Sequence, residues 1–196
     1  MKKAMKLVWM VLFALPMVAF TACGDEDEPD NGLKFKDYSV LLNKDRKDIL
    51  EKQMKDCTPY YQNLDGIFYD NDGNDLGQYI NEVDCYFTFE DLEENPSAVP
   101  EEKCVWVDTE MSGVNAADLM NYLTDKYGKA AAENDDMDSY TFTKGNMYVW
   151  YDIDAEEGVC YVGYVNKKSY DDYNNGNAQN IRKAIKARRA AKRAAR

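Results

Sequence analysis

The sequence predicts an α+β fold, a two-layer antiparallel sheet with helices on one face. Two amphipathic helical segments each precede three short strand patterns, and 45% hydrophobic residues with fifteen tyrosines indicate a folded, strand-rich body. The order helix, three strands, helix, three strands indicates a weak tandem αβββ duplication, with units over 38–110 and 111–168. Residue identity between these units is low, so the repetition is also compatible with chance.

The first unit begins with a helix that we expect between Ser39 and Cys57. Its apolar side chains return with a period of about 3.6 residues, and Pro59 bars its continuation. The strand over 83–90 is the clearest of those that follow, because Val83 and Phe87 alternate with polar residues. The three strands are expected at residues 66–70, 83–90 and 104–109.

The second unit begins with a helix that Asn115 can cap and that Gly128 can end. Leu119, Leu123 and Tyr127 form its buried stripe. Turns at Lys144-Gly145-Asn146 and Glu156-Glu157-Gly158 then separate three strands. These strands are expected at residues 139–143, 146–152 and 159–165.

Residues 1 to 22 have the order of a bacterial signal segment. A basic start is followed by an apolar run of about 14 residues, too short for a hydrocarbon core of about 30 Å, so we expect cleavage rather than a transmembrane helix. The boundary Phe20-Thr21-Ala22-Cys23-Gly24 resembles a bacterial lipobox, although Phe20 stands where leucine is usual. The resemblance implies that Cys23 becomes the lipid-bearing first residue of the mature protein and anchors it to a membrane.

Residues 23 to 37 are expected to form a lipidated, acidic tether. Asp25 to Gly32 contains no apolar residue that could pack. An acidic stretch at this position resembles the export signal of Bacteroidetes-type surface lipoproteins, which implies an outer membrane lipoprotein exposed at the cell surface. A plain hydrophilic spacer is the alternative. Leu-Thr-Asp-Lys-Tyr-Gly at 123–128, followed by an aromatic hairpin, also resembles small exported bacterial domains and implies no activity.

Charge is distributed unevenly along the chain. The leader holds three of the 24 basic residues and residues 181 to 196 hold eight, so residues 23 to 180 combine all 36 acidic residues with 13 basic ones, a net charge of about −23. Such a surface repels nucleic acid, which is therefore not an expected partner. It favours cations, basic proteins or neutral glycans, or it serves solubility outside the cell.

Residues 169 to 196 are expected to lie beyond the folded domain, which spans 38–168. Ser169 to Asn180 has the composition of a polar linker, and Ile181 to Arg196 is a basic tail with too few apolar residues to dock firmly. We expect a solvated extension with weak, screened attraction to the acidic body.

Histidine is absent from the sequence, which removes the commonest general base and the commonest metal ligand. No phosphate-binding glycine loop is present either. An enzyme would have to use carboxylates or a cysteine, and no catalytic residue is singled out. The composition favours a non-enzymatic role without a cofactor.

The best candidate for a cation site is the segment Asp70-Asn71-Asp72-Gly73-Asn74-Asp75. Asp70, Asp72 and Asp75 could supply oxygen ligands to Ca²⁺, but the spacing fails the EF-hand pattern. The alternative is a tight turn built on Asp-Gly.

Four cysteines other than Cys23 allow two disulfides in three pairings. Cys85 and Cys104 lie on neighbouring expected strands and could form a bridge, but both also suit buried free thiols. The four cysteines are Cys57, Cys85, Cys104 and Cys160.

Aromatic side chains on the expected strands are the candidates for ligand binding. Trp106, Tyr148 and Trp150 could stack on sugar rings if they face solvent, whereas core packing is the alternative. The sequence therefore predicts a surface-anchored binding module for a glycan or a protein. The alternatives are an exported enzyme that attacks polysaccharide through carboxylates, and an inhibitor or immunity-like protein.

Overall fold

The structure, a computed structural model, describes residues 33–90, 92, 95–130, 132–134, 139–174 and 189. For residues 132–134 and 174 it gives the course of the backbone alone. The expected signal segment, Cys23 and most of the tether lie outside the described residues, as does the basic tail apart from Arg189.

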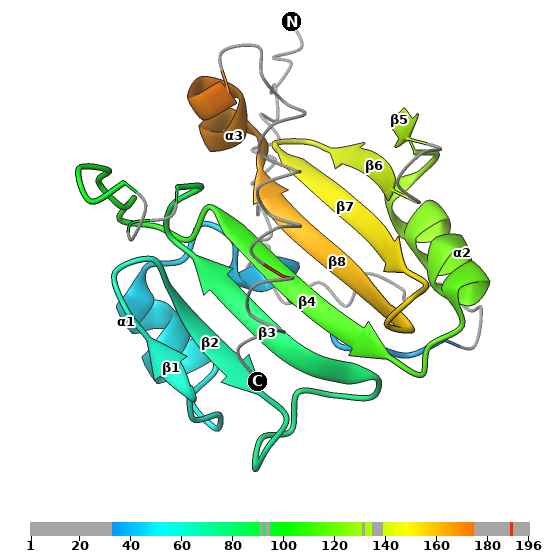
Figure 1. The fold of residues 1–196 in the computed structure, drawn as a ribbon, viewed down its shortest axis with the longest axis horizontal. Coiled ribbons are helices and arrows are strands. Elements are labelled where there is room, and N and C mark those ends of the chain that lie inside the picture. The colour runs from blue at the N-terminus through cyan, green and yellow to red at the C-terminus, as the bar shows by residue number, and fades with distance from the viewer. Residues whose placement is uncertain are drawn as a thin grey trace, which may run out of the picture.

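Within the described residues, eight strands form one open antiparallel sheet, as Figure 1 shows. The strands are β1 (Tyr61–Gln62), β2 (Gly66–Asp70), β3 (Ile80–Tyr86), β4 (Trp106–Ser112), β5 (Ala132–Asn134), β6 (Ser139–Lys144), β7 (Met147–Asp154) and β8 (Val159–Asn166). Their order in the sheet is β1-β2-β3-β4-β8-β7-β6-β5. Together with the helices, this sheet confirms the predicted α+β fold class.

The sheet consists of two halves with the same order of elements. Strands β1 to β4 follow one helical segment and strands β5 to β8 follow another, and the halves meet where β4 pairs with β8. Each half holds four strands rather than the three we expected. The additional strands, β1 and β5, are only two and three residues long, so alternation of side chains could not reveal them.

The N-terminal helical segment is shorter than the helix expected between Ser39 and Cys57. A 3₁₀ turn, η1 (Ser39–Leu41), is followed by the short helix α1 (Arg46–Asp48) and a π-helical turn, η2 (Ile49–Gln53). The interruption comes at Asn43, whose φ of 65° is left-handed. Asp45 then starts α1, because its side chain accepts a hydrogen bond from the Asp48 N–H at 2.8 Å.

Helix α2 (Ala116–Tyr127) confirms the second predicted helix. The Asn115 side chain accepts hydrogen bonds from the N–H groups of Ala117 and Asp118 at 2.9 and 3.2 Å, as a helix cap does. Gly128 ends the helix with a φ of 83°. The expected stripe is buried, and Tyr122 joins it in the core.

A third helix, α3 (Lys167–Asn174), corrects the expectation of a linker from Ser169 onward. The Asn166 side chain accepts a hydrogen bond from the Ser169 N–H at 2.9 Å, and Lys168 pairs with Asp172 one turn later. Tyr170 is buried against Trp150. The sequence does not predict this helix because it has no apolar stripe. The Asn166 cap and the packing of the Tyr170 ring stabilise it instead.

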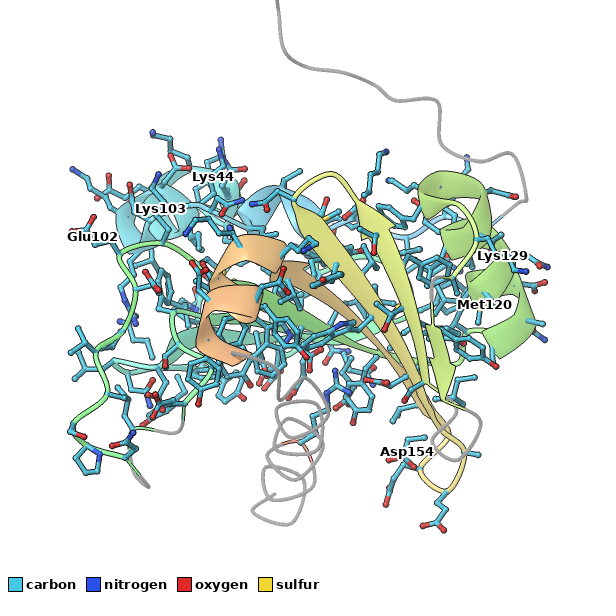
Figure 2. The ribbon with its side chains drawn as sticks, turned by 90° about the horizontal axis from the view of Figure 1, so that it is seen from above. Lys44, Glu102, Lys103, Met120, Lys129 and Asp154 are labelled. Carbon is cyan, nitrogen blue, oxygen red and sulfur yellow. The ribbon has the colours of Figure 1, made fainter. Side chains whose placement is uncertain are left out.

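Helices α1 and α2 lie on one side of the sheet. The main core lies between this helical layer and the sheet. Viewed from above, Asp154 at the end of β7 points to the other side (Figure 2). A second, smaller group of buried aromatic residues lies on that other side, where α3 contributes Tyr170. One face of the sheet therefore packs against the main core, and the other face carries both charged and aromatic side chains.

Candidate guanidinium-binding face

The sheet face opposite to α1 and α2, which we call the acidic face, combines carboxylates with aromatic rings. Side chains alternate along each strand, so Val83 and Val107 belong to the main core while Asp84 and Asp108 project to the acidic face. Asp84 pairs with Asp108 across β3 and β4, and Asp108 pairs with Gly163 of β8. The strand register therefore places carboxylates of neighbouring strands side by side.

Four carboxylate residues on the acidic face are only 2 to 6% exposed: Glu82, Asp84, Asp108 and Asp152. Removing like charges from water costs free energy unless donors or cations compensate. The sheet supplies some of the donors, because the Tyr86 hydroxyl donates to Asp84 at 3.1 Å and the Ser139 hydroxyl donates to Asp152 at 2.6 Å. A cation from the C-terminal tail contributes further compensation.

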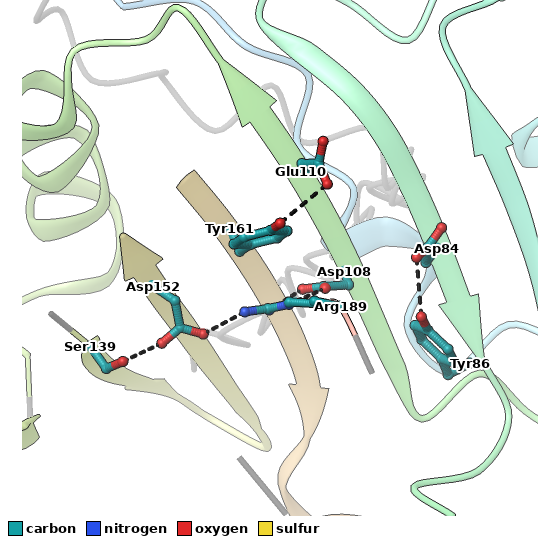
Figure 3. Close-up of polar contacts among 8 residues, drawn as sticks. All are labelled: Asp84, Tyr86, Asp108, Glu110, Ser139, Asp152, Tyr161 and Arg189. Carbon is teal, nitrogen blue, oxygen red and sulfur yellow. Dashed lines mark hydrogen bonds and ion pairs between the residues drawn. The ribbon is translucent and has the colours of Figure 1, made fainter. Parts of the chain in front are cut away.

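That cation is Arg189, which lies between Asp108 of β4 and Asp152 of β7 (Figure 3). Its Nε and Nη2 donate to the two carboxylate oxygens of Asp108 at 2.7 and 2.6 Å, and its Nη1 donates to Asp152 at 2.8 Å. Arg189 is itself only 7% exposed. A planar fork that meets one carboxylate with two parallel hydrogen bonds is the strongest form of this contact, and it is specific to guanidinium.

An aromatic ring completes the surroundings of Arg189. The guanidinium carbon lies 4.0 Å from the centre of the Tyr161 ring, at the distance of a cation–π contact. The Tyr161 hydroxyl donates to Glu110 at 3.2 Å, and Glu110 also accepts from Asn81 at 3.3 Å. These contacts hold the ring in place on β8. We call Asp108, Asp152 and Tyr161 the guanidinium site.

The charges of the guanidinium site keep Arg189 protonated. Burial alone would lower the pKa of Arg189, but the Asp108 and Asp152 carboxylates outweigh it and raise the pKa above its ordinary value. The pKa of Asp108 lies above its ordinary value, mainly because the carboxyl is buried. The charges of Asp84 and Asp152 raise this pKa further, whereas Arg189 lowers it. The site is therefore a buried ion-pair cluster, in which the positive charge of Arg189 offsets the repulsion between the carboxylates.

Gly163 allows side chains of the neighbouring strands to approach the backbone of β8 closely at the centre of the acidic face. A Cβ atom at this position would lie 3.3 Å from Trp106 Nε1 and 3.4 Å from Asp108 Oδ1. Among the described residues, Trp106 Nε1 has no hydrogen-bond partner although the side chain is buried. The Trp106 indole N–H and the Asp108 carboxylate thus both lie close to the backbone of Gly163 on β8.

The predicted binding residues Trp106, Tyr148 and Trp150 all project to the acidic face, where the two tryptophans belong to the smaller buried group and Tyr148 packs against it. Trp106 stacks on Tyr86 at 4.1 Å between ring centres, and Trp150 meets the edge of Tyr170 at 5.1 Å. Both tryptophans are 2% exposed or less, so their ring faces serve packing in this structure. Tyr148 is half-buried and donates to Asp171 at 3.2 Å. Contact of these rings with a ligand stays a prediction.

The predicted cation residues lie in and around the turn after β2. Asp70 accepts a hydrogen bond from the Asp72 N–H at 3.2 Å, and Asp75 accepts one from the Gly77 N–H at 3.1 Å. The segment is thus ordered as a turn by hydrogen bonds from its backbone N–H groups to its own carboxylates. In the part of the chain that the structure describes, no three His, Cys, Asp or Glu side chains gather as a metal site would require. Calcium binding by Asp70, Asp72 and Asp75 stays a prediction.

The four cysteines are free thiols in this structure. Cys85 and Cys104 are neighbours in the core, where a hydrogen bond between their thiols, and then burial, raise the pKa of Cys85 well above its ordinary value. Cys160 is also buried and Cys57 is half-buried. Cys104 also donates a hydrogen bond to the Trp106 carbonyl at 3.3 Å. A Cys85–Cys104 bridge stays a prediction.

The guanidinium site was not predicted from the sequence. Asp84, Asp108 and Asp152 each lie within a predicted strand, and the recurrence of Asp within three strands is the signal that the sequence carries. Nothing in the tail distinguishes Arg189 from its neighbours. The expected weak attraction between tail and body understates the contact, because Arg189 is buried rather than screened by solvent.

The chain matches no protein-family model, and comparison with curated proteins and with solved structures likewise finds no similar protein. None of the described helices combines the length and the apolar character needed to cross a membrane.

Proposed function

We propose that this protein is a non-enzymatic binding module that recognises a basic segment of a partner protein through its acidic face. The observation that carries the proposal is the guanidinium held by Asp108, Asp152 and Tyr161. These groups satisfy an arginine side chain by hydrogen bonds, charge and ring stacking at once.

The electrostatics of the acidic face favour a basic ligand over a neutral one. Glu82, Asp84, Asp108 and Asp152 are all buried there, and their mutual repulsion falls when a cation binds. A neutral glycan provides hydrogen bonds but no positive charge. Trp106 and Trp150, which would stack on a sugar, are covered by other rings. A protein ligand is therefore the better fit of the two ligand classes.

We further propose that the module is anchored through Cys23 as an outer membrane lipoprotein at the cell surface. Support comes from the order of the leader and from the lipobox-like residues before Cys23. Mass spectrometry of the native protein tests this: a chain that begins at an acylated Cys23 supports the anchor, and an unmodified Met1 contradicts it.

The binding proposal is tested by calorimetry with the mature chain, residues 23–196, and an arginine-rich peptide. The double variant Asp108→Asn/Asp152→Asn removes both carboxylates of the guanidinium site, and we expect affinity to fall about tenfold or more. The matched control Asp118→Asn/Asp125→Asn removes the same charge from exposed positions on α2 and should bind like the wild type.

Two results would contradict the proposal. One is equal loss of affinity in both double variants, because net charge rather than the acidic face would then govern binding. The other is release of new reducing ends from a polysaccharide by the mature chain, which would make the protein an enzyme.

A further inference from the structure

The guanidinium site is already occupied by a residue of the same chain. Arg189 is 81 residues from Asp108 and 37 residues from Asp152 in the sequence, yet it contacts both. The site that receives it belongs to the sheet: Asp108 lies on β4, Asp152 on β7 and Tyr161 on β8. Strand register fixes these three side chains relative to one another, independently of the tail.

The sheet also holds the receiving groups in position by contacts that do not involve Arg189. The Ser139 hydroxyl donates a hydrogen bond to Asp152 at 2.6 Å, and Glu110 accepts a hydrogen bond from the Tyr161 hydroxyl at 3.2 Å. Gly163 lies directly below Asp108 and Trp106, and the lack of a side chain there lets both approach the backbone of β8. Such preorganisation is what a receptor for an incoming side chain requires.

The geometry selects guanidinium over ammonium. Three N–H donors of Arg189 reach three carboxylate oxygens while its flat face lies on the Tyr161 ring. An ammonium group carries the same charge, but it has no planar fork to meet Asp108 with two parallel bonds. Arginine and lysine should therefore differ strongly at this site.

We infer that Asp108, Asp152 and Tyr161 form an arginine-specific receptor that Arg189 fills as an internal ligand, and that an arginine side chain of a partner protein binds by displacing Arg189. This inference rests on the proposed function, since it names the ligand group and the regulation of the same face. A tethered internal ligand competes at an effective concentration of about millimolar. The apparent affinity for a partner is reduced by the fraction of chains in which the site is free.

The test compares the wild-type mature chain with Arg189→Ala and Arg189→Lys by calorimetry. The probes are a peptide of alternating arginine and alanine and its lysine counterpart of equal length. If the tail occupies the site in nine chains of ten, we expect Arg189→Ala to bind the arginine peptide about tenfold more tightly than the wild type does. Arg189→Lys should gain nearly as much, since it keeps the charge but lacks the fork, and the lysine peptide should bind about tenfold more weakly.

Two results would overturn the inference while leaving the proposed function intact. One is equal affinity of the wild type and Arg189→Ala for the arginine peptide. The other is equal affinity of one chain for the arginine and lysine peptides. In both cases the proposed function stands if Asp108→Asn/Asp152→Asn still lowers affinity about tenfold or more. Failure of every chain to bind either peptide, with near-ultraviolet circular dichroism confirming folded protein, would overturn the proposed function as well.

Discussion

Arg189 and Asp108 stabilise each other in a position where each alone would destabilise the fold. Asp108 lies among the buried carboxylates of Asp84 and Asp152, and its pKa above the ordinary value reflects that environment. Without the guanidinium, the acidic face would hold like charges with fewer donors. The stability of the fold should therefore depend on the pair rather than on either residue separately.

A double-mutant cycle between Arg189 and Asp108 should show this dependence as a change of sign. We expect Arg189→Ala to lower the free energy of unfolding by about 1–3 kcal/mol, because buried carboxylates lose their cation. In that background Asp108→Asn should raise stability, since it removes one of the crowded charges, whereas in the wild type it should lower stability. Urea unfolding of the four chains measures the cycle. A loss of equal size on adding Asp108→Asn to either background would show that the two residues are not coupled.

Asp37 and Lys126 form a second ion pair, which ties the segment before η1 to α2. Lys126 Nζ lies 2.8 Å from Asp37, and the Tyr127 hydroxyl donates to the same carboxylate at 2.9 Å. Burial alone would raise the pKa of Asp37, but hydrogen bonds from Lys126 and the Ser39 N–H hold it below its ordinary value of 3.8. The folded state therefore favours the charged carboxylate more than the unfolded state does.

This depressed pKa predicts a contribution to stability that is present above about pH 4 and is lost as the pH falls towards the folded-state pKa. Asp37→Asn should cost about 1–3 kcal/mol at pH 7, and its free energy of unfolding should fall less steeply than that of the wild type below pH 4. Urea unfolding between pH 7 and pH 2.5 measures both slopes, with the exposed Asp125→Asn as control. Parallel curves for Asp37→Asn and the wild type would exclude this contribution.

Helix α3 shows at the level of elements what the sequence could and could not reveal. Helix α2 was predictable because Asn115, Gly128 and an apolar stripe are local signals of a start, an end and a buried face. Helix α3 has no apolar stripe, and its stability depends on Tyr170 meeting Trp150, Tyr148 and Phe89 from distant parts of the chain. Contacts of that kind are decided by the tertiary fold and leave little trace in a local pattern.

Packing of α3 through one ring predicts a large effect of Tyr170→Ala. We expect a loss of about 3 kcal/mol in unfolding free energy, because a ring that is 6% exposed leaves a cavity. Trp106 and Trp150 are the two tryptophans of residues 23–196, so exposure of Trp150 should shift the fluorescence emission to longer wavelength. Tyr173→Ala, at a residue 44% exposed on the same helix, should leave the emission unchanged. Unchanged emission in Tyr170→Ala would show that α3 does not cover Trp150.

The whole molecule joins two similar halves into one sheet, and its acidic face spans the junction. Asp108 belongs to β4 of the first half, whereas Asp152 and Tyr161 belong to β7 and β8 of the second. Alternation along single strands predicted the fold class and most strands. It could not predict the guanidinium site, because the site depends on the pairing of β4 with β8 and on the approach of Arg189.

The proton on Arg189 Nε reports most directly on whether the acidic face binds guanidinium. In the structure this proton is donated to Asp108 at 2.7 Å in a buried setting. Nitrogen-edited NMR of the mature chain should therefore show it exchanging with water about tenfold or more slowly than in Asp108→Asn/Asp152→Asn. Equal exchange rates in the two chains would contradict the contact of Arg189 with Asp108 and Asp152, the observation on which the binding proposal depends.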